Sequence, residues 1–289
     1  MTGSTGGTIE KPALITPEVL RAWKLPEPGG SKYSRGQVLV IGGAAATPGA
    51  VMLAGTAALR MGAGRLALAV DAAVAPHVAV AMPESGVSGL DDERSMAGEA
   101  SGADAVLVGP GLGDADVACE LLERVVALVG DDTPIVLDAY GATVLPDVSK
   151  SCRTALAGRL LATPNQGELA QLVGADQLAD NEIAAAADTV RGTYDATVAA
   201  GGWVIAADGA WRSTSGDTGL GTSGSGDVLA GAVTGLLARG AVQAQAMVWA
   251  VHTHSAAGDV LAGRLGRVGY LAHELTAELP LVLGSLRGD

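Results

Sequence analysis

"GTSGSGDVLAGAVTGLLARG", residues 221–240, places three glycines among small hydroxyl residues directly before a long apolar segment. Valine, leucine and alanine then recur at helical spacing, which predicts a helix that begins at Asp227. The first N–H groups of a helix have no partner inside it, and together with the helix dipole they attract anions. Glycines just before them allow the backbone to approach a phosphate group closely. The stretch therefore predicts an anion site at the start of a helix, formed by Gly224, Ser225 and Gly226.

Asp227 stands at this junction, and two interpretations of it stay open. As a general base it would take a proton from a hydroxyl group that attacks a phosphoryl group bound by the glycines. As a plain helix cap it would need no ligand, because aspartate is a favoured capping residue and Gly-Ser turns are common. The stretch is not a Walker A loop, since no Gly-Lys-Ser/Thr sequence follows.

Outward from this stretch, short apolar runs alternate with longer segments rich in alanine and leucine. Each run ends in Gly, Asp or Pro, and the runs lie in residues 37–43, 65–70, 103–113, 134–140, 158–164 and 201–209. Residues 49–64 predict a helix closed by Gly62 or Gly64. This alternation predicts an α/β fold, with a mostly parallel sheet covered by helices on both faces. Ligands of such sheets bind beyond the carboxyl ends of the strands, where the polar motifs of this chain fall.

Composition predicts a globular chain with one large core. Of its 289 residues 48% are hydrophobic and 17% are charged, and phenylalanine is absent, so valine, leucine, isoleucine and alanine must fill the core. No linker divides the sequence. We expect a flexible polar tail over residues 1–11 and a single catalytic domain over residues 12–289.

Charge and cysteine usage exclude several classes of function. The net charge is −13, from 31 acidic and 18 basic residues, which argues against binding to nucleic acid or to an anionic membrane. No apolar stretch is long enough for a transmembrane helix. Cys119 and Cys152 show neither a zinc pattern nor a disulfide framework, which favours a reducing, cytoplasmic location.

The opening stretch resembles the Gly-x-Gly-Asp signature of the ribokinase-like superfamily, and its surroundings resemble the ADP- or ATP-dependent NAD(P)H-hydrate dehydratases. The resemblance covers residues 36–262, and its further segments match in order: "GQVLVIGGAAATPGAVMLAGTAALRMGAGRLALAV", "DAVLVGPGLG", "PIVLDAYG", "TPNQGELAQLVG" and "WAVHTHSAAGDVLA". It implies a ribokinase-like three-layer fold. It also implies a repair reaction, in which NADH or NADPH hydrated at the nicotinamide ring is phosphorylated on the new hydroxyl group and then loses phosphate.

The resemblance also assigns expected roles to individual positions. Asp227 matches the base, and Gly224, Ser225 and Gly226 match the anion hole for the transferred phosphoryl group. The positions implied for the hydrated substrate are Ala50, Gly111, Gly113, Asn165 and Asp227, and those implied for ADP or ATP are Ala200, Gly201, Thr222 and Gly226. Glycines after a strand are ordinarily turn residues, which is the competing interpretation of Gly111 and Gly113. The family further implies a homo-oligomer.

Two positions depart from the family pattern. Asn165 replaces the usual histidine of a Thr-Pro-His motif and forms Asn-x-x-Glu with Glu168, as in ribokinase-like sugar kinases, whose glutamate organises Mg²⁺ through water. A solvated first-turn carboxylate is the alternative for Glu168. Ala200-Gly201 stands where a Lys-Gly pair is usual, which removes a positive charge near the nucleotide. Asp138 lies at a strand end, where a cap or a turn is as good an explanation as a catalytic role.

The histidines and tryptophans carry weaker signals. His252 and His254 are two residues apart and would lie on different faces of a helix, so a shared metal site is disfavoured and packing or hydrogen bonding is expected. Trp203, Trp211 and Trp249 could stack on a base, but packing in the core or at its rim is the expected use.

Three functions therefore remain in competition: a hydrate dehydratase, a small-molecule kinase of the same fold, and a non-catalytic nucleotide sensor. Asn165, Glu168 and the missing lysine favour the kinase. Asp227 argues against the sensor, because a sensor needs an anion site but no base.

Overall fold

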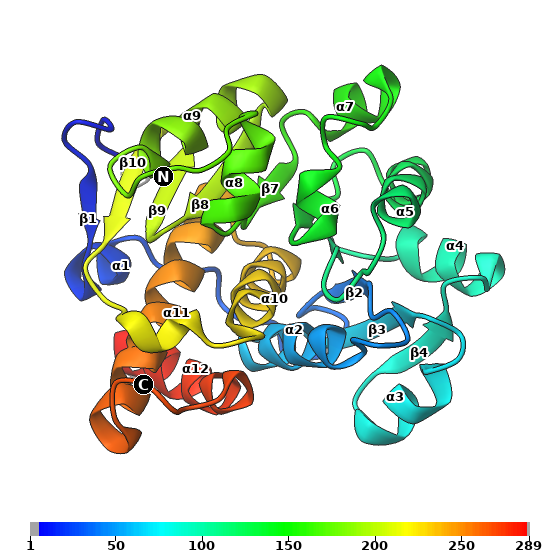
Figure 1. Cartoon of the computed structure of the whole chain (residues 1–289). Coiled ribbons are helices and arrows are strands. Elements are labelled where there is room, and N and C mark those ends of the chain that lie inside the picture. The colour runs from blue at the N-terminus through cyan, green and yellow to red at the C-terminus, as the bar shows by residue number, and fades with distance from the viewer. Residues whose placement is uncertain (1–5, 288–289) are drawn as a thin grey trace.

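The computed structural model describes residues 6–287, which form one ten-stranded sheet between two layers of helices (Figure 1). The strands are β1 (Ala13–Ile15), β2 (Gln37–Ile41), β3 (Arg65–Val70), β4 (Gly86–Gly89), β5 (Ala105–Val108), β6 (Ile135–Leu137), β7 (Leu160–Ala162), β8 (Ala196–Ala200), β9 (Trp203–Ala206) and β10 (Gly209–Ser213).

The described α-helices connect these strands or follow them. They are α1 (Pro17–Ala22), α2 (Gly49–Arg60), α3 (Ala75–Ala81), α4 (Glu93–Ser101), α5 (Ala115–Leu128), α6 (Tyr140–Thr143), α7 (Lys150–Leu156), α8 (Gln166–Leu172), α9 (Ile183–Tyr194), α10 (Ser225–Ala238), α11 (Gln243–Leu265) and α12 (Ala272–Arg287), with a short 3₁₀ helix η1 (Thr218–Gly221) before α10. None of the helices within residues 6–287 has the length and apolar character needed to cross a membrane.

The sheet has the strand order β1-β10-β9-β8-β7-β6-β5-β2-β3-β4, and every neighbouring pair from β8 to β4 is parallel. The predicted mostly parallel sheet is therefore confirmed. One strand differs from the prediction: residues 201–209 read as another parallel unit, but β9 runs antiparallel to both β8 and β10. The reason is local, because Gly201 and Gly202 both have positive φ and close a two-residue turn between β8 and β9.

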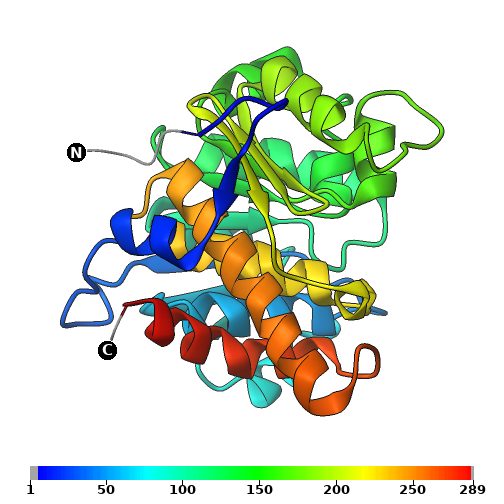
Figure 2. The ribbon, with the colours of Figure 1, turned by 90° about the vertical axis from the view of Figure 1, so that its left-hand side faces the viewer.

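Two hydrophobic cores fill the space on either side of the sheet. Along β2, Val38 and Val40 join the core under α1, α2, α3, α10, α11 and α12, whereas Leu39 and Ile41 join the core under α4 to α9. This alternation is the period of a strand that is buried on both faces. The predicted three-layer arrangement is confirmed, and both views show α11 and α12 lying side by side in the first of these layers (Figures 1 and 2).

Close packing of α10 on α2 fixes the position of the opening stretch. A methyl group at Gly231 would overlap the carbonyl oxygen of Ala54, and one at Gly235 would overlap that of Ala58. Glycines four residues apart thus let the two helix backbones touch. The predicted helix over residues 49–64 is α2, and Gly62, with φ +107°, follows its end as expected.

The N-terminal segment is in part attached to the sheet. The N–H group of Gly7 donates to the carbonyl oxygen of Ala210, and the N–H group of Ala210 donates to that of Gly7, both at 2.9 Å. Within the predicted tail, Gly7 is therefore paired with the edge of the sheet through β10. Residues 1–5 of that tail lie outside the described residues.

Tryptophan packing agrees with the expectation of core packing for two side chains and of rim packing for the third. Trp211 and Trp249 are fully buried, and Trp211 stacks on Trp23 with ring centroids 5.9 Å apart. The indole N–H of Trp249 donates to the carbonyl oxygen of Trp23 at 2.9 Å. Trp203 is only half-buried and lies at a cleft beside the sheet.

Candidate active site

Helix α10 begins at Ser225, two residues before the predicted start at Asp227. Gly224 is its N-cap and has φ +88°, a conformation that glycine adopts without strain. Gly224 makes the turn, so the helix begins with Ser225 and Gly226. Asp227 is the third residue of its first turn. The predicted helix start is corrected, while the predicted group of residues still lies at the helix N-terminus.

The N–H groups of this turn are not equally available. Ser225 donates its N–H to the carbonyl oxygen of Thr222 at 3.2 Å, and Val228 donates to Gly224 at 3.2 Å. Within the described residues no such partner is found for the N–H groups of Gly226 and Asp227. A methyl group at Gly226 would meet no atom within 4 Å, so this side of the turn is open. The open donors for an anion are therefore those of Gly226 and Asp227.

A cleft of about 520 Å³ lies against this turn. Its walls come from the carboxyl ends of β7 and β8, from β10 and the loop after it, and from α11. Five of the predicted site residues line it: Asn165, Ala200, Gly201, Ser225 and Gly226. The structure thus brings the predicted nucleotide residues Ala200, Gly201 and Gly226 to one cavity, and Thr222 is not among its lining residues.

Gly111 and Ala50 meet at a second corner of the same sheet edge, outside the lining of this cleft. The carbonyl oxygen of Gly111 accepts hydrogen bonds from the N–H of Ala44 at 2.8 Å and from Thr47 Oγ1 at 2.7 Å. A methyl group on Gly111, whose φ is +66°, would lie 2.9 Å from the Cβ of Ala50. Gly113 is exposed two residues further on.

Helix α2 connects this corner to the start of α10. A methyl group on Gly224 would lie nearest to the side chain of Leu53, which is one turn after Ala50. Because β5, which precedes Gly111, and β7, which precedes Asn165, run in the same direction, both corners lie at the carboxyl edge of the sheet. The two groups of predicted residues are therefore on one edge, as expected.

Three carboxyl groups influence one another near the start of α10. Burial, followed by the charges of Asp227 and Glu168, raises the pKa of Asp138 to about 7. Burial and the charge of Glu168 raise the pKa of Asp227 to about 6. The hydroxyl of Thr163 donates to Asp138 Oδ1 at 2.9 Å and fixes that side chain. A carboxyl group with a pKa near 6 is ionised at neutral pH and is more basic than an ordinary aspartate, which suits proton abstraction.

Asn165 and Glu168 form a capping box at the start of α8. Asn165 Oδ1 accepts from the N–H groups of Gly167 and Glu168 at 2.9 and 3.0 Å, and Glu168 Oε2 accepts from the N–H of Asn165 at 3.0 Å. The Asn-x-x-Glu spacing is a variant of the sequence signal for this motif, a role that the prediction for Asn165 and Glu168 did not include. Burial raises the pKa of Glu168, and among the described residues no hydrogen bond is found for its Oε1. Within residues 6–287 no three acidic, histidine or cysteine side chains form a metal cluster.

His254, for which packing or hydrogen bonding is expected, reaches the first turn of α10. Its Nε2 lies 3.1 Å from Ser225 Oγ and 3.0 Å from the carbonyl oxygen of Ser225. Burial lowers the pKa of His254 to about 4, so the ring is neutral. The sequence holds no signal for this contact, because the two residues are 29 positions apart.

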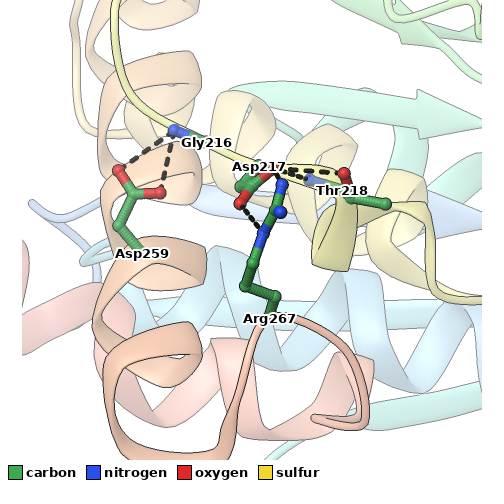
Figure 3. A network of polar contacts seen from close by, with 5 residues as sticks. All are labelled: Gly216, Asp217, Thr218, Asp259 and Arg267. Atoms are coloured by element: carbon green, nitrogen blue, oxygen red, sulfur yellow. Dashed lines mark hydrogen bonds and ion pairs between the residues drawn. The ribbon is translucent and has the colours of Figure 1, made fainter.

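The loop between β10 and α10 forms the outer wall of the cleft and is tied down by charged groups (Figure 3). Gly216 donates its N–H to both carboxylate oxygens of Asp259 on α11, at 3.1 and 3.0 Å. Asp217 accepts two hydrogen bonds from Arg267, at 2.6 and 2.7 Å, and one from the N–H of Thr218. These bonds hold the pKa of Asp217 well below its usual range. The wall is therefore held by exposed ionic contacts to the α11–α12 region.

Comparisons with known proteins agree with this geometry. The family model described as NAD(P)H-hydrate dehydratase matches residues 38–281. The chain is 41% identical over 286 residues to an ADP-dependent (S)-NAD(P)H-hydrate dehydratase of Xanthomonas campestris, covering 94% of this chain and 96% of that one. It is 30% identical over 276 residues to a protein of the same name from Listeria monocytogenes, covering 93% and 95%.

Solved structures give the same result. The ADP/ATP-dependent NAD(P)H-hydrate dehydratase of Bacillus subtilis, co-crystallised with ATP and Mg²⁺, superposes with a TM-score of 0.78 at 26% identity, covering 95% of this chain and 98% of that one. A ribokinase-like superfamily protein of Enterococcus faecalis superposes with a TM-score of 0.80 at 23% identity, covering 96% and 97%, which bears on the fold alone.

Proposed function

Because the chain belongs to the NAD(P)H-hydrate dehydratase family, we propose that it restores hydrated NADH and NADPH in a reaction driven by ADP or ATP. The hydroxyl group of the hydrated ring is phosphorylated, and phosphate then leaves with that oxygen. The observation that carries the proposal is the position of Asp227. It combines a pKa of about 6 with a place in the same helical turn as the open N–H groups at the cleft.

In this proposal Asp227 takes the proton of the attacking hydroxyl group. The free N–H groups of Gly226 and Asp227 stabilise negative charge on the transferred phosphoryl group, and Gly224 supplies the turn that aims them. Ser225 acts mainly through its bonds to Thr222 and His254, which hold the turn in place. The family's nucleotide fits the cleft, because a volume of about 520 Å³ and these donors suit a polyphosphate ligand.

The hydrated dinucleotide is assigned to the corner formed by Ala50, Gly111 and Gly113, with Asn165 on the side of the cleft. Close backbone packing of Gly111 on Ala50 and Thr47 supports this assignment, because it keeps side chains away from the strand ends. Glu168 is proposed to orient Mg²⁺-bound water near the phosphates with its Oε1, while its other oxygen keeps the capping box. Mg²⁺ would neutralise phosphate charge.

Location and assembly are part of the same proposal. Both cysteines are free thiols, which supports a reducing cytoplasmic setting. A homo-oligomer is proposed on the family resemblance.

The experiment is to incubate the protein with hydrated NADH, Mg²⁺ and either ADP or ATP, and to measure both phosphate and the absorbance of the reduced nicotinamide. Equal amounts of released phosphate and restored NADH are expected. A stable phosphorylated product without restored absorbance would identify a kinase instead. Reactions without nucleotide, and with the Asp227→Asn variant, are the controls.

A further inference from the structure

The cleft beside α10 has one cationic side chain. The chain carries a net charge of −13, which disfavours the approach of a nucleotide. Among the described residues that line the cleft, Arg212 is the only lysine or arginine. The donors at the start of α10 are backbone groups with partial charge. Among the described lining side chains, the permanent positive charge available to an anionic ligand is therefore that of Arg212.

The guanidinium group of Arg212 is held in place by the β8–β9–β10 meander. Arg212 pairs in register with Trp203 on the neighbouring antiparallel strand, and its guanidinium lies over the indole ring, 5.0 Å from the ring centroid. One terminal nitrogen donates to the carbonyl oxygen of Gly201 in the turn between β8 and β9. Stacking on an indole ring restrains the planar group and leaves its edge accessible.

The turn leaves room for this arrangement. Gly202 has φ +80°, and a methyl group there would lie 3.3 Å from Arg212 Nη1. Within the described residues, Nη1 has a hydrogen-bond partner, and no bond is found for Nε and Nη2. Two donors of a fork that matches phosphate oxygens are thus free, on a side chain that keeps its charge at every relevant pH.

We propose that Arg212 binds the phosphate groups of the nucleotide, with Trp203 and Gly201 holding its guanidinium toward the cleft. The assignment rests on the proposed function, because it takes a nucleoside diphosphate or triphosphate as the occupant of this cavity. It gives β10, a strand that carries none of the expected substrate-, nucleotide- or metal-binding residues, a direct part in selecting phosphorylated ligands over the bare nucleoside.

Calorimetric titration with adenosine, AMP and ADP, at fixed Mg²⁺, tests the assignment without reference to turnover. For Arg212→Gln, the Kd for ADP is expected to rise roughly 10- to 100-fold, the usual worth of a charge-assisted hydrogen bond. The Kd for adenosine is expected to change less than about twofold, since it has no phosphate to lose. Arg212→Lys keeps the charge but not the fork, and an intermediate Kd is expected.

Arg191→Gln is the matched control, because it removes the same charge from α9, where Arg191 pairs with Asp188 at 2.6 Å outside the cleft. Circular dichroism and melting curves establish that each variant is folded. Unchanged ADP binding by folded Arg212→Gln would overturn the assignment, and so would equal weakening of adenosine and ADP, which would place Arg212 at the base. A parent protein that binds neither ADP nor ATP would instead contradict the proposed function, and the assignment with it.

Discussion

His254 contacts both oxygens of Ser225 through a single ring nitrogen, Nε2, at 3.1 and 3.0 Å. A carbonyl oxygen can only accept, so Nε2 carries the proton. Because burial lowers the pKa of His254 to about 4, this tautomer stays neutral over the working range of pH. A buried histidine of α11, which itself lines the cleft, therefore holds the first residue of α10.

His254→Ala is expected to lower turnover roughly tenfold and the melting temperature by a few degrees, because two buried oxygens lose their donor. His254→Gln, which keeps an N–H donor, should recover part of both. Steady-state kinetics and thermal melts measure the effects, and His77→Ala, at an exposed position of α3, is the control. An unchanged KM for nucleotide and an unchanged kcat in the alanine variant would show that the contact has no positioning role.

Asp227→Asn is expected to lower kcat roughly 10²- to 10⁴-fold while the Kd for ADP stays within about threefold, since a positioned base contributes that much to rate and little to binding. In the parent, activity should rise with pH through about 6 as Asp227 ionises. A pH–rate profile and calorimetry provide the measurements, with Asp131→Asn, an exposed acid far along the chain, as control. If turnover survives in the asparagine variant, another group is the base.

Asp138 should make the protein less stable as pH rises. Burial raises its pKa from 3.8 to about 7, so between those values the folded protein holds a proton that the unfolded chain has released. The stability gained from this proton is complete below about pH 4 and is lost as pH passes through about 7. Asp138→Asn keeps an acceptor for Thr163 and removes the titration.

Relative to the parent, the free energy of unfolding of Asp138→Asn is therefore expected to increase from pH 5 to pH 8, by an amount on the order of a few kcal/mol. Urea unfolding at several pH values measures it. A constant difference between variant and parent across this range would mean that Asp138 titrates normally.

Gly226 and Gly231 should respond to alanine in opposite ways. A methyl group at Gly226 meets no atom within 4 Å, so Gly226→Ala should melt within a few degrees of the parent, yet lose turnover roughly 10²- to 10³-fold because the methyl group stands over the phosphate donors. Gly231→Ala would overlap the backbone of Ala54 and should lose about 1–3 kcal/mol of stability or more.

Melting curves and activity per folded molecule distinguish the two variants. A fully active Gly226→Ala variant would make the glycine a helix cap and nothing more. A Gly231→Ala variant as stable as the parent would contradict the close packing of α10 on α2.

Much of this architecture follows from the order of residues along the chain. Doubly buried strands such as residues 37–41 and 105–108 are continuous apolar runs, and their glycine ends predict the edge at which Gly111, Asn165 and Gly226 gather. The direction of β9 could not be predicted from the same rule. Its run is as apolar as the others, and only the paired glycines before it distinguish a tight turn from a crossover.

The contacts that complete the site depend on distant parts of the chain. Arg212 reaches the cleft because β10 pairs with β9, and His254 reaches Ser225 because α11 packs beside α10; neither pairing leaves a periodic signal. The start of α10 was misplaced for a local reason. The sequence offers two residues that can start this helix, Gly224 with its positive φ and Asp227. The glycine is the cap, so the helix begins two residues earlier than the aspartate predicts.

The floor and the outer wall of the cleft are held by different kinds of contact, which respond differently to salt. The floor is α10, which packs backbone to backbone against α2 through Gly231 and Gly235. This packing involves no charged groups and does not depend on salt. The wall is fastened by the exposed pairs of Asp217 with Arg267 and of Asp259 with the N–H of Gly216 (Figure 3). Rising ionic strength weakens these charged contacts but does not weaken the packing of α10 on α2. High salt should therefore loosen the outer wall, and with it the access to the cleft, while the first turn of α10 keeps its shape.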